Sequence, residues 1–314
     1  MNYLLGIDVG TMCTAAAVAR LRGGRVEPRA VTLGDRADVA PSVVYLAEDG
    51  AVIFGESAEQ RAISEPERVV REFIRRIGDP TPIVVGGRTF AAEELSAHAV
   101  RWVLNQVTER EGGPPARVAV THPASWGPHK RELLATTLSG QGVTATFLTE
   151  PQAAAQAYAA NEHVEPGATF AVYDLGGGTF KAAVVRKDER GFQVLGRPEE
   201  LERLGGVDFD EAVFEHVRAE LSEAFDDLDE SDPEVWAAMA HLRRECTQAK
   251  ETLSAHTEVT IPVQLPGARA SVQLSRADFE AMIRSHVEET VTALQRAVTS
   301  ANLVPEQLTA VLLV

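Results

Sequence analysis

The chain has 314 residues, of which 45% are hydrophobic, and a formal net charge of −16 at pH 7. That length fits roughly two domains with a sizeable core, and no apolar run approaches the roughly 18 residues of a membrane-spanning helix. The acidic balance argues against nucleic acid or an anionic membrane as the main partner, because both are themselves negatively charged. The two cysteines, Cys13 and Cys246, have no CxxC spacing, so we expect neither a zinc site nor a disulfide scaffold and favour a reducing cytoplasm.

The N-terminal residues predict a strand, a turn and a second strand. Apolar runs at 3–7 and 15–19 flank the sequence Asp8-Val9-Gly10-Thr11-Met12-Cys13. Because Asp8 interrupts the first run and no basic segment precedes it, we expect a strand here and not a signal peptide. Turns are predicted at Gly23-Gly24 and Gly34-Asp35.

The sequence pattern changes over residues 41–113. Short strands are predicted at 43–46 and 52–54, followed by charged helical stretches at 67–77 and 91–109. A buried strand at 118–120 and a helix from Lys130 to Leu138 come next. Pro151 then suits the first turn of a helix predicted at 152–160.

A second glycine-rich turn, Asp174-Leu175-Gly176-Gly177-Gly178-Thr179-Phe180, lies between strands predicted at 169–173 and 182–185. Glycines there let backbone N–H groups converge on an anion. A carboxylate beside phosphate implies an intervening cation, so the pair predicts Mg²⁺ held through water. One such turn could equally be an ordinary tight hairpin. Its repetition near Asp8 suggests a duplicated domain whose halves face each other across one nucleotide.

The rest of the chain alternates helices and strands. A long helical segment follows Gly205-Gly206 and contains the acidic run 223–232, which we interpret as a solvated surface. Further helices are predicted at 239–253 and 278–301, and strands at 259–263 and 310–314.

Taken together, these motifs resemble the nucleotide-binding domain of the Hsp70 chaperones, in the superfamily that also contains actin and the sugar kinases. Family landmarks occur in the family's order nearly end to end: Pro41-Ser42-Val43-Val44, Pro123-Ala124, Glu150-Pro151-Gln152-Ala153-Ala154-Ala155, Gly205-Gly206-Val207-Asp208-Phe209-Asp210 and Ala249-Lys250-Glu251-Thr252-Leu253-Ser254.

The resemblance implies an α/β fold, the duplicated ribonuclease H-like fold of actin-like ATPases, with mixed sheets and an inserted subdomain in each lobe. Lobe I would span 1–163 with a cap at about 41–113, and lobe II 164–314 with an insertion at about 207–280. In the family the strand at 310–314 runs into another glycine turn and a helix. We therefore expect the chain to be a fragment, truncated at that point.

The resemblance also implies ATP or ADP with Mg²⁺ as ligands. Asp8 and Asp174 would order the hydration shell of the metal, and Glu150 would orient its waters or the attacking water. The phosphates would contact Gly10, Thr11, Met12 and Cys13 on one side and Gly176, Gly177, Gly178 and Thr179 on the other. The remaining nucleotide contacts would come from Gly205, Gly206, Lys250 and Ser254, and the last two, four residues apart, would share a helical face.

Two departures from the family pattern concern hydrolysis. Ile74 stands where the family has a lysine expected to stabilise the γ-phosphate, unless a gapped alignment places Arg75 there, and Lys181 replaces an aspartate. Because losing one preorganised charge-stabilising donor typically costs ~10² to 10³ in rate, we expect slow or impaired hydrolysis and less affected binding. One hypothesis is that Lys181 acts catalytically by restoring the charge lost at Ile74. The alternative is a lysine that turns to solvent or pairs with a nearby acid.

Three functions stay open at this point. They are an Hsp70-like ATP-binding module that drives an attached domain, a pseudo-ATPase scaffold without nucleotide turnover, and a small-molecule kinase. The kinase is least favoured, because the 150–155 and 205–210 motifs match the chaperone branch. A nucleotide-exchange factor or a C-terminal effector domain are the partners to expect. Stimulation by a J-domain protein is not expected, since Thr146 stands where the family's docking surface is basic.

Overall fold

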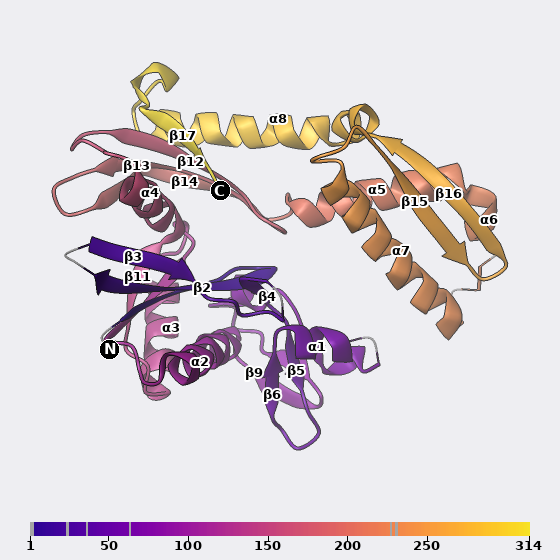
Figure 1. Ribbon diagram of the computed structural model, residues 1–314, viewed down its shortest axis with the longest axis horizontal. Coiled ribbons are helices and arrows are strands. Elements are labelled where there is room, and N and C mark those ends of the chain that lie inside the picture. The colour runs from indigo at the N-terminus through magenta and orange to yellow at the C-terminus, as the bar shows by residue number, and fades with distance from the viewer. Residues whose placement is uncertain (1–2, 23–24, 36, 63, 227, 230–231) are drawn as a thin grey trace. The chain divides into compact units, whose positions relative to one another are not determined.

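The computed structural model describes residues 3–22, 25–35, 37–62, 64–226, 228–229 and 232–314 (Figure 1). The turn expected at Gly23-Gly24 and part of the acidic run 223–232 lie outside these residues. The chain forms two compact units. Unit 1 comprises 1–177, 181–199 and 297–314, and unit 2 comprises 178–180 and 200–296. The division into lobes at 163/164 stays a prediction.

The first sheet of unit 1 is built around the predicted N-terminal hairpin. In β1 buried side chains alternate with more exposed ones, which is the pattern of a strand with one face on a core. β1 pairs antiparallel with β2 and parallel with β10. The strands are β1 (Leu4–Val9), β2 (Cys13–Arg22), β3 (Arg25–Ala30), β4 (Val39–Pro41), β10 (Arg117–His122) and β11 (Ala145–Thr149), in the order β11-β10-β1-β2-β3 with β4 on β2.

Two helices cover this sheet, and both were predicted. α2 (Ala92–Glu111) packs against β1, and α3 (Pro128–Gly140) packs against α2 and β11. The core between them contains apolar side chains that are almost wholly shielded from solvent, among them Leu5, Ile7, Leu95, Val103 and Leu134. This packing fixes the ends of β1 and β10, where the site residues begin.

The prediction of a helix at 67–77 is wrong. This stretch forms a 3₁₀ turn (Pro66–Arg68), the short strand β7 (Val69–Val70) and a second 3₁₀ turn (Phe73–Arg76). Val69 and Val70 pair with β5, and Glu72 has a left-handed backbone with φ 53°, which ends any regular helix. The other small elements of this region are β5 (Val44–Leu46), β6 (Val52–Phe54), α1 (Glu56–Arg61), β8 (Ile83–Val85) and β9 (Arg88–Phe90).

The second sheet of unit 1 carries the second glycine turn. Its strands are β12 (Thr169–Leu175), β13 (Phe180–Lys187), β14 (Phe192–Leu201) and β17 (Ala310–Leu313), in the order β14-β13-β12-β17. β17 runs parallel to β12. α4 (Glu150–Asn161) packs against β12 and also contacts β10 and β11 of the first sheet, so one helix touches both sheets.

Unit 2 consists of helices packed on a β-hairpin. It contains α5 (Gly206–Glu220), α6 (Ser222–Asp226), α7 (Pro233–Thr252), β15 (Glu258–Leu265), β16 (Ala268–Ser275) and most of α8 (Arg276–Ser300). β15 alternates exposed and buried residues, so one face of the hairpin packs on α7 while the other remains open to solvent. Among the described residues, no helix combines the length and the apolar character needed to span a bilayer.

Candidate nucleotide-binding site

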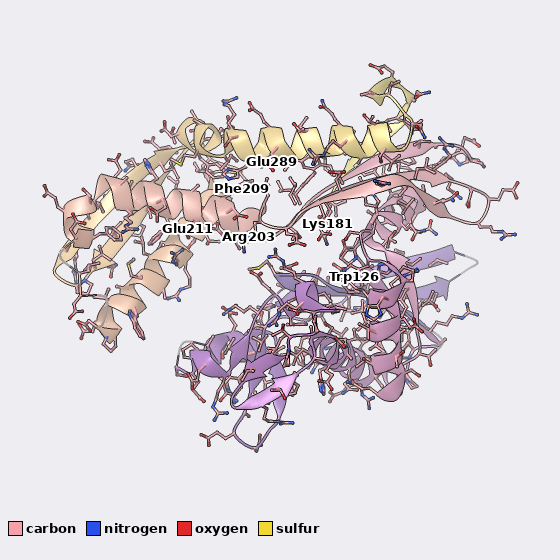
Figure 2. All side chains as sticks on the ribbon, turned by 180° about the vertical axis from the view of Figure 1, so that it is seen from behind. Trp126, Lys181, Arg203, Phe209, Glu211 and Glu289 are labelled. Carbon is pink, nitrogen blue, oxygen red and sulfur yellow. The ribbon has the colours of Figure 1, made fainter. Side chains whose placement is uncertain are left out.

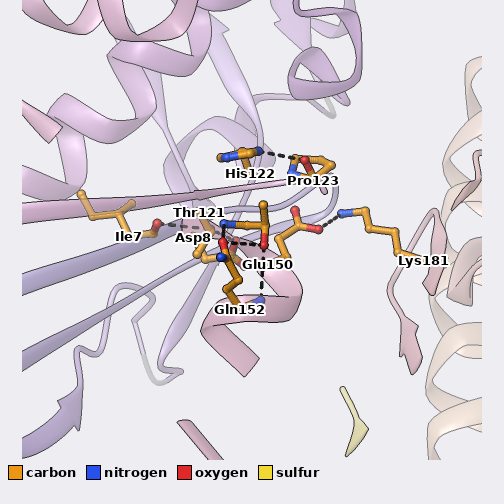
Figure 3. A network of polar contacts seen from close by, with 9 residues as sticks. Ile7, Asp8, Thr121, His122, Pro123, Glu150, Gln152 and Lys181 are labelled. Atoms are coloured by element: carbon orange, nitrogen blue, oxygen red, sulfur yellow. Dashed lines mark hydrogen bonds and ion pairs between the residues drawn. The ribbon is translucent and has the colours of Figure 1, made fainter. Parts of the chain in front are cut away.

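Asp8 is held in place by the neighbouring strand. It lies near the end of β1, and its carboxylate accepts a short hydrogen bond from the Thr121 hydroxyl on β10 (Figure 3). The same hydroxyl lies 3.4 Å from the Ile7 carbonyl oxygen. Thr121 was not a predicted site residue. The only signal in the sequence was its place directly after the strand predicted at 118–120, and the parallel pairing of β1 with β10 then brings the ends of both to one edge.

The first glycine turn, residues 10–13, follows directly. The Gly10 N–H donates to the Cys13 carbonyl at 3.0 Å, and the Met12 carbonyl accepts from the Ser42 N–H at 2.8 Å. A Cβ on Gly10 would lie only 2.8 Å from the Cys13 carbonyl oxygen. The turn therefore requires glycine at this position.

Gly177 of the second glycine turn, residues 176–179, contacts the first glycine turn within unit 1. A Cβ on Gly177 would lie 2.5 Å from Cγ of Met12 and 2.9 Å from its Cβ. Real Cβ atoms do not approach other heavy atoms that closely, so the Met12 side chain packs directly on the bare Gly177 backbone. The two glycine turns thus contact each other through Met12 and Gly177, which are 165 residues apart in sequence.

Glu150 is the first residue of α4, and the start of that helix is anchored at several points. The Thr149 N–H donates to Oε1 of Gln152 at 3.0 Å, and Nε2 of Gln152 donates to the Phe192 carbonyl at 2.7 Å. These contacts tie the first turn of α4 to β14. Gln152, which was not among the predicted site residues, thereby fixes the backbone from which the Glu150 carboxylate projects.

Lys181 forms an ion pair with Glu150. Its Nζ lies 2.5 Å from Oε2 of Glu150, and the two side chains are 20% and 16% exposed (Figure 3). Lys181 is the second residue of β13, between the buried side chains of Phe180 and Ala182. The structure thus shows Lys181 paired with a nearby acid, and its catalytic role stays a prediction.

The profile of the family described as Hsp70 protein matches residues 4–314, which is nearly the whole chain. The chain belongs to the Hsp70 family. Its mixed sheets are those of the family's duplicated, actin-like ATPase fold, and it is a chaperone-type nucleotide-binding domain.

In this Hsp70-family chain we define the acid cluster as Asp8, Glu150 and Asp174. The charges of the two aspartates affect the protonation of Glu150. Burial, with a smaller contribution from the negative charges of Asp8 and Asp174, raises the pKa of Glu150 to about 7. The Lys181 ammonium opposes this rise in the pKa but does not cancel it. Glu150 therefore titrates near neutral pH, because desolvation disfavours its charged form.

The pH dependence of folding should report this carboxyl group. The folded state keeps a proton on Glu150 that the unfolded chain releases near the ordinary pKa of 4.5. The contribution of Glu150 to the free energy of unfolding is thus fully present below that pH and falls by up to about 3 kcal/mol as the pH rises to 7. Urea unfolding of the wild type and of Glu150→Gln between pH 4 and pH 8 measures this decline in the free energy of unfolding.

In Glu150→Gln this part of the decline should be absent. Glu132→Gln, which removes an exposed carboxylate from α3, is the control and should follow the wild-type profile. Parallel profiles of the wild type and Glu150→Gln would contradict the raised pKa.

The acid cluster suits the Mg²⁺ that the family implies. Its carboxylate oxygens are the donors that Mg²⁺ prefers, and Mg²⁺ usually keeps several waters in its first shell. In the described ranges, no group of three or more His, Cys, Asp or Glu side chains could hold a metal ion directly. Asp8 and Asp174 would therefore hold the ion through its waters. When bound, it would neutralise charge on the phosphates.

The residues expected at the adenosine lie in unit 2. Lys250 on α7 pairs with Asp210 at 2.8 Å and donates to the Gly206 carbonyl at 3.2 Å, so it ties α7 to the start of α5. The expectation that Lys250 and Ser254 share a helical face is wrong, because α7 ends at Thr252 and Ser254 lies in the turn that follows.

The Gly205-Gly206 pair forms the start of α5, where the Gly205 N–H donates to Oδ2 of Asp208 at 2.8 Å. Further along α5, the Phe209 ring packs edge-on against His286 with centroids 6.1 Å apart. Figure 2 labels Phe209 and its neighbour Glu211, which pairs with Arg243 of α7. The start of α5 is thus fixed within unit 2.

Ile74, which replaces the expected lysine, is a packing residue. Its side chain lies partly buried against the core of unit 1. Arg75, the alternative from a gapped alignment, pairs with Glu72 at 2.8 Å. Neither observation places a cation from this segment at the phosphates.

Proposed function

We propose that this chain binds ATP or ADP with Mg²⁺ between its two lobes, couples nucleotide state to lobe closure, and hydrolyses ATP slowly or with impairment. The observation that carries the proposal is the contact between the two glycine turns beside the acid cluster. Backbone N–H groups of such turns bind phosphate without a Cβ in the way.

Each site residue then has a proposed role. Asp8 and Asp174 hold the hydrated metal, and Glu150 orients water. Phosphate contacts come from Gly10, Thr11, Met12, Cys13, Gly176, Gly177, Gly178 and Thr179, and nucleoside contacts from Gly205, Gly206, Lys250 and Ser254. A nucleotide-exchange factor or an effector domain would respond to the nucleotide state, in the cytoplasm that the cysteine content favours.

The Lys181–Glu150 ion pair supports slow hydrolysis. A carboxylate that accepts from an ammonium at 2.5 Å has less capacity to accept a proton from, or orient, an attacking water. Ile74 adds no positive charge for the transition state. Since one missing preorganised donor costs ~10² to 10³ in rate, we expect nucleotide turnover far below that of an intact site.

The test is the stability of the chain with and without Mg·ATP. A ligand present at about 100 times its Kd should stabilise the folded chain by about 2.7 kcal/mol. Thermal or urea unfolding measures this gain, and single-turnover experiments with labelled ATP measure the hydrolysis rate.

The same ion pair also favours a second function, a pseudo-ATPase that serves as an interaction scaffold. In that case unfolding would be the same with and without nucleotide, and no hydrolysis would be seen. A stabilised chain with a slow but measurable rate would instead support the first function.

A further inference from the structure

The Lys181 ammonium lies beside one carboxylate of the acid cluster. Its Nζ is 2.5 Å from Glu150, whose pKa also responds to the charges of Asp8 and Asp174. Three carboxylates within electrostatic range of one another repel, and repulsion is stronger in a partly desolvated site than in water. A positive charge bound covalently to the chain offsets this repulsion without any ion from solution.

The position of this ammonium is fixed by the strand that carries it. Phe180 and Ala182, the neighbours of Lys181 in β13, are 0% and 1% exposed. Because side chains alternate along a strand, Phe180 and Ala182 lie on one buried face of the sheet and Lys181 lies on the opposite face. The lysine cannot leave the site by sliding in register without exposing Phe180.

The same strand begins directly after the second glycine turn, so the ammonium is close in sequence to the phosphate-binding backbone. A lysine ammonium is a compact point charge with three N–H donors. One donor meets Glu150, and the positive charge attracts phosphate oxygens as well as carboxylates. A hydrated Mg²⁺ performs the same bridging with its own charge.

We propose that Lys181 is a built-in counter-cation that bridges Glu150 and the terminal phosphate oxygens, so that nucleotide binding by this chain depends only weakly on a soluble divalent cation. The inference rests on the proposed function, because it concerns the same site. In this proposal Lys181 supplies charge that Mg²⁺ would otherwise supply, and it does not compensate for the lysine missing at Ile74. It also concerns affinity and not the rate of hydrolysis.

The experiment is a calorimetric titration of the 314-residue chain with ATP, once in excess Mg²⁺ and once in EDTA. We expect the wild-type Kd to differ by less than about tenfold between the two conditions. Lys181→Met keeps the apolar stem and removes the charge. Because a charge-assisted hydrogen bond is lost, it should bind ATP roughly 10- to 100-fold more weakly in EDTA, with most of the loss restored by Mg²⁺.

Two further variants sharpen the comparison. Lys181→Asp replaces a positive by a negative charge and should make binding strictly dependent on Mg²⁺. Lys187→Met is the matched control, because Lys187 lies on the same strand but donates to the Asp188 carbonyl at 2.8 Å. It should leave both titrations unchanged.

The outcomes separate this inference from the proposed function. Wild-type binding that falls more than about tenfold in EDTA would overturn the counter-cation role, whatever the variants do and even if Lys181→Met fails to fold. Equal binding by Lys181→Met and the wild type in EDTA would overturn it too. No ATP binding by the wild type in either condition would instead contradict the proposed function.

Discussion

Replacing Gly196 with alanine is expected to destabilise unit 1 by roughly 2 to 5 kcal/mol. Gly196 lies inside β14 with φ +64°, a left-handed backbone that costs an L-residue about 1 to 2 kcal/mol. A Cβ there would lie 2.5 Å from the Ala301 nitrogen and 2.7 Å from the Ser300 carbonyl carbon. These are backbone atoms at the end of α8, so overpacking adds about 1 to 3 kcal/mol.

Hydrogen bonds hold the end of α8 close to β14 next to Gly196. The Ser300 hydroxyl accepts from the Arg197 N–H at 2.7 Å and lies 3.2 Å from the Arg197 carbonyl. The end of α8 is thus hydrogen-bonded to β14 next to the glycine. A side chain at 196 would push these partners apart.

Gly167→Ala is the matched control. Gly167 also has a left-handed backbone, with φ +93°, but a Cβ there would meet no atom within 4 Å. Urea unfolding of both variants separates the backbone strain, which they share, from the steric clash, which only Gly196→Ala has. Equal losses of stability would show that the contact with α8 contributes nothing.

Phe170→Ala should cost about 3 to 5 kcal/mol of folding free energy, the usual loss for a buried phenylalanine. Phe170 on β12 is 1% exposed and lies in the core of the second sheet. Its ring meets Tyr158 of α4 edge-on, with centroids 5.4 Å apart, and Phe192 of β14 at 6.1 Å. The truncation would leave a cavity between α4 and the sheet that these rings cannot fill.

Calorimetry or urea unfolding measures this loss. Phe170→Leu keeps most of the apolar volume and should be clearly less destabilising. A loss below about 1 kcal/mol for Phe170→Ala, within the range of ordinary surface substitutions, would contradict the packing described for this core.

The sequence predicted the strands and helices whose own residues carry a regular pattern. The strands at 3–7 and 169–173 and the helix at 91–109 are confirmed to within a few residues. The helix at 239–253 is also confirmed, but it begins six residues earlier than predicted, at Pro233. The prediction failed at 67–77, where charged residues suggested a helix. There Val69 and Val70 pair with β5 instead, because a neighbouring strand edge outweighs weak helical propensity.

The charge balance of the candidate site was predictable only in part. The two acidic turns and the substitutions at Ile74 and Lys181 were visible in the sequence, together with the motifs that resemble the Hsp70 family. Whether Lys181 meets an acid or solvent was not. A long flexible side chain can reach several partners, and only the positions of the surrounding strands decide between them.

By itself, then, the sequence determined the family resemblance and the N-terminal hairpin, since these follow from residue types at short spacing and from local backbone geometry. Tertiary structure alone decided which side chains meet. Lys181 and Glu150 are 31 positions apart, and Thr121 and Asp8 are 113 positions apart. Such pairs form only after the sheets have packed, because packing and not sequence spacing sets the distance between their atoms.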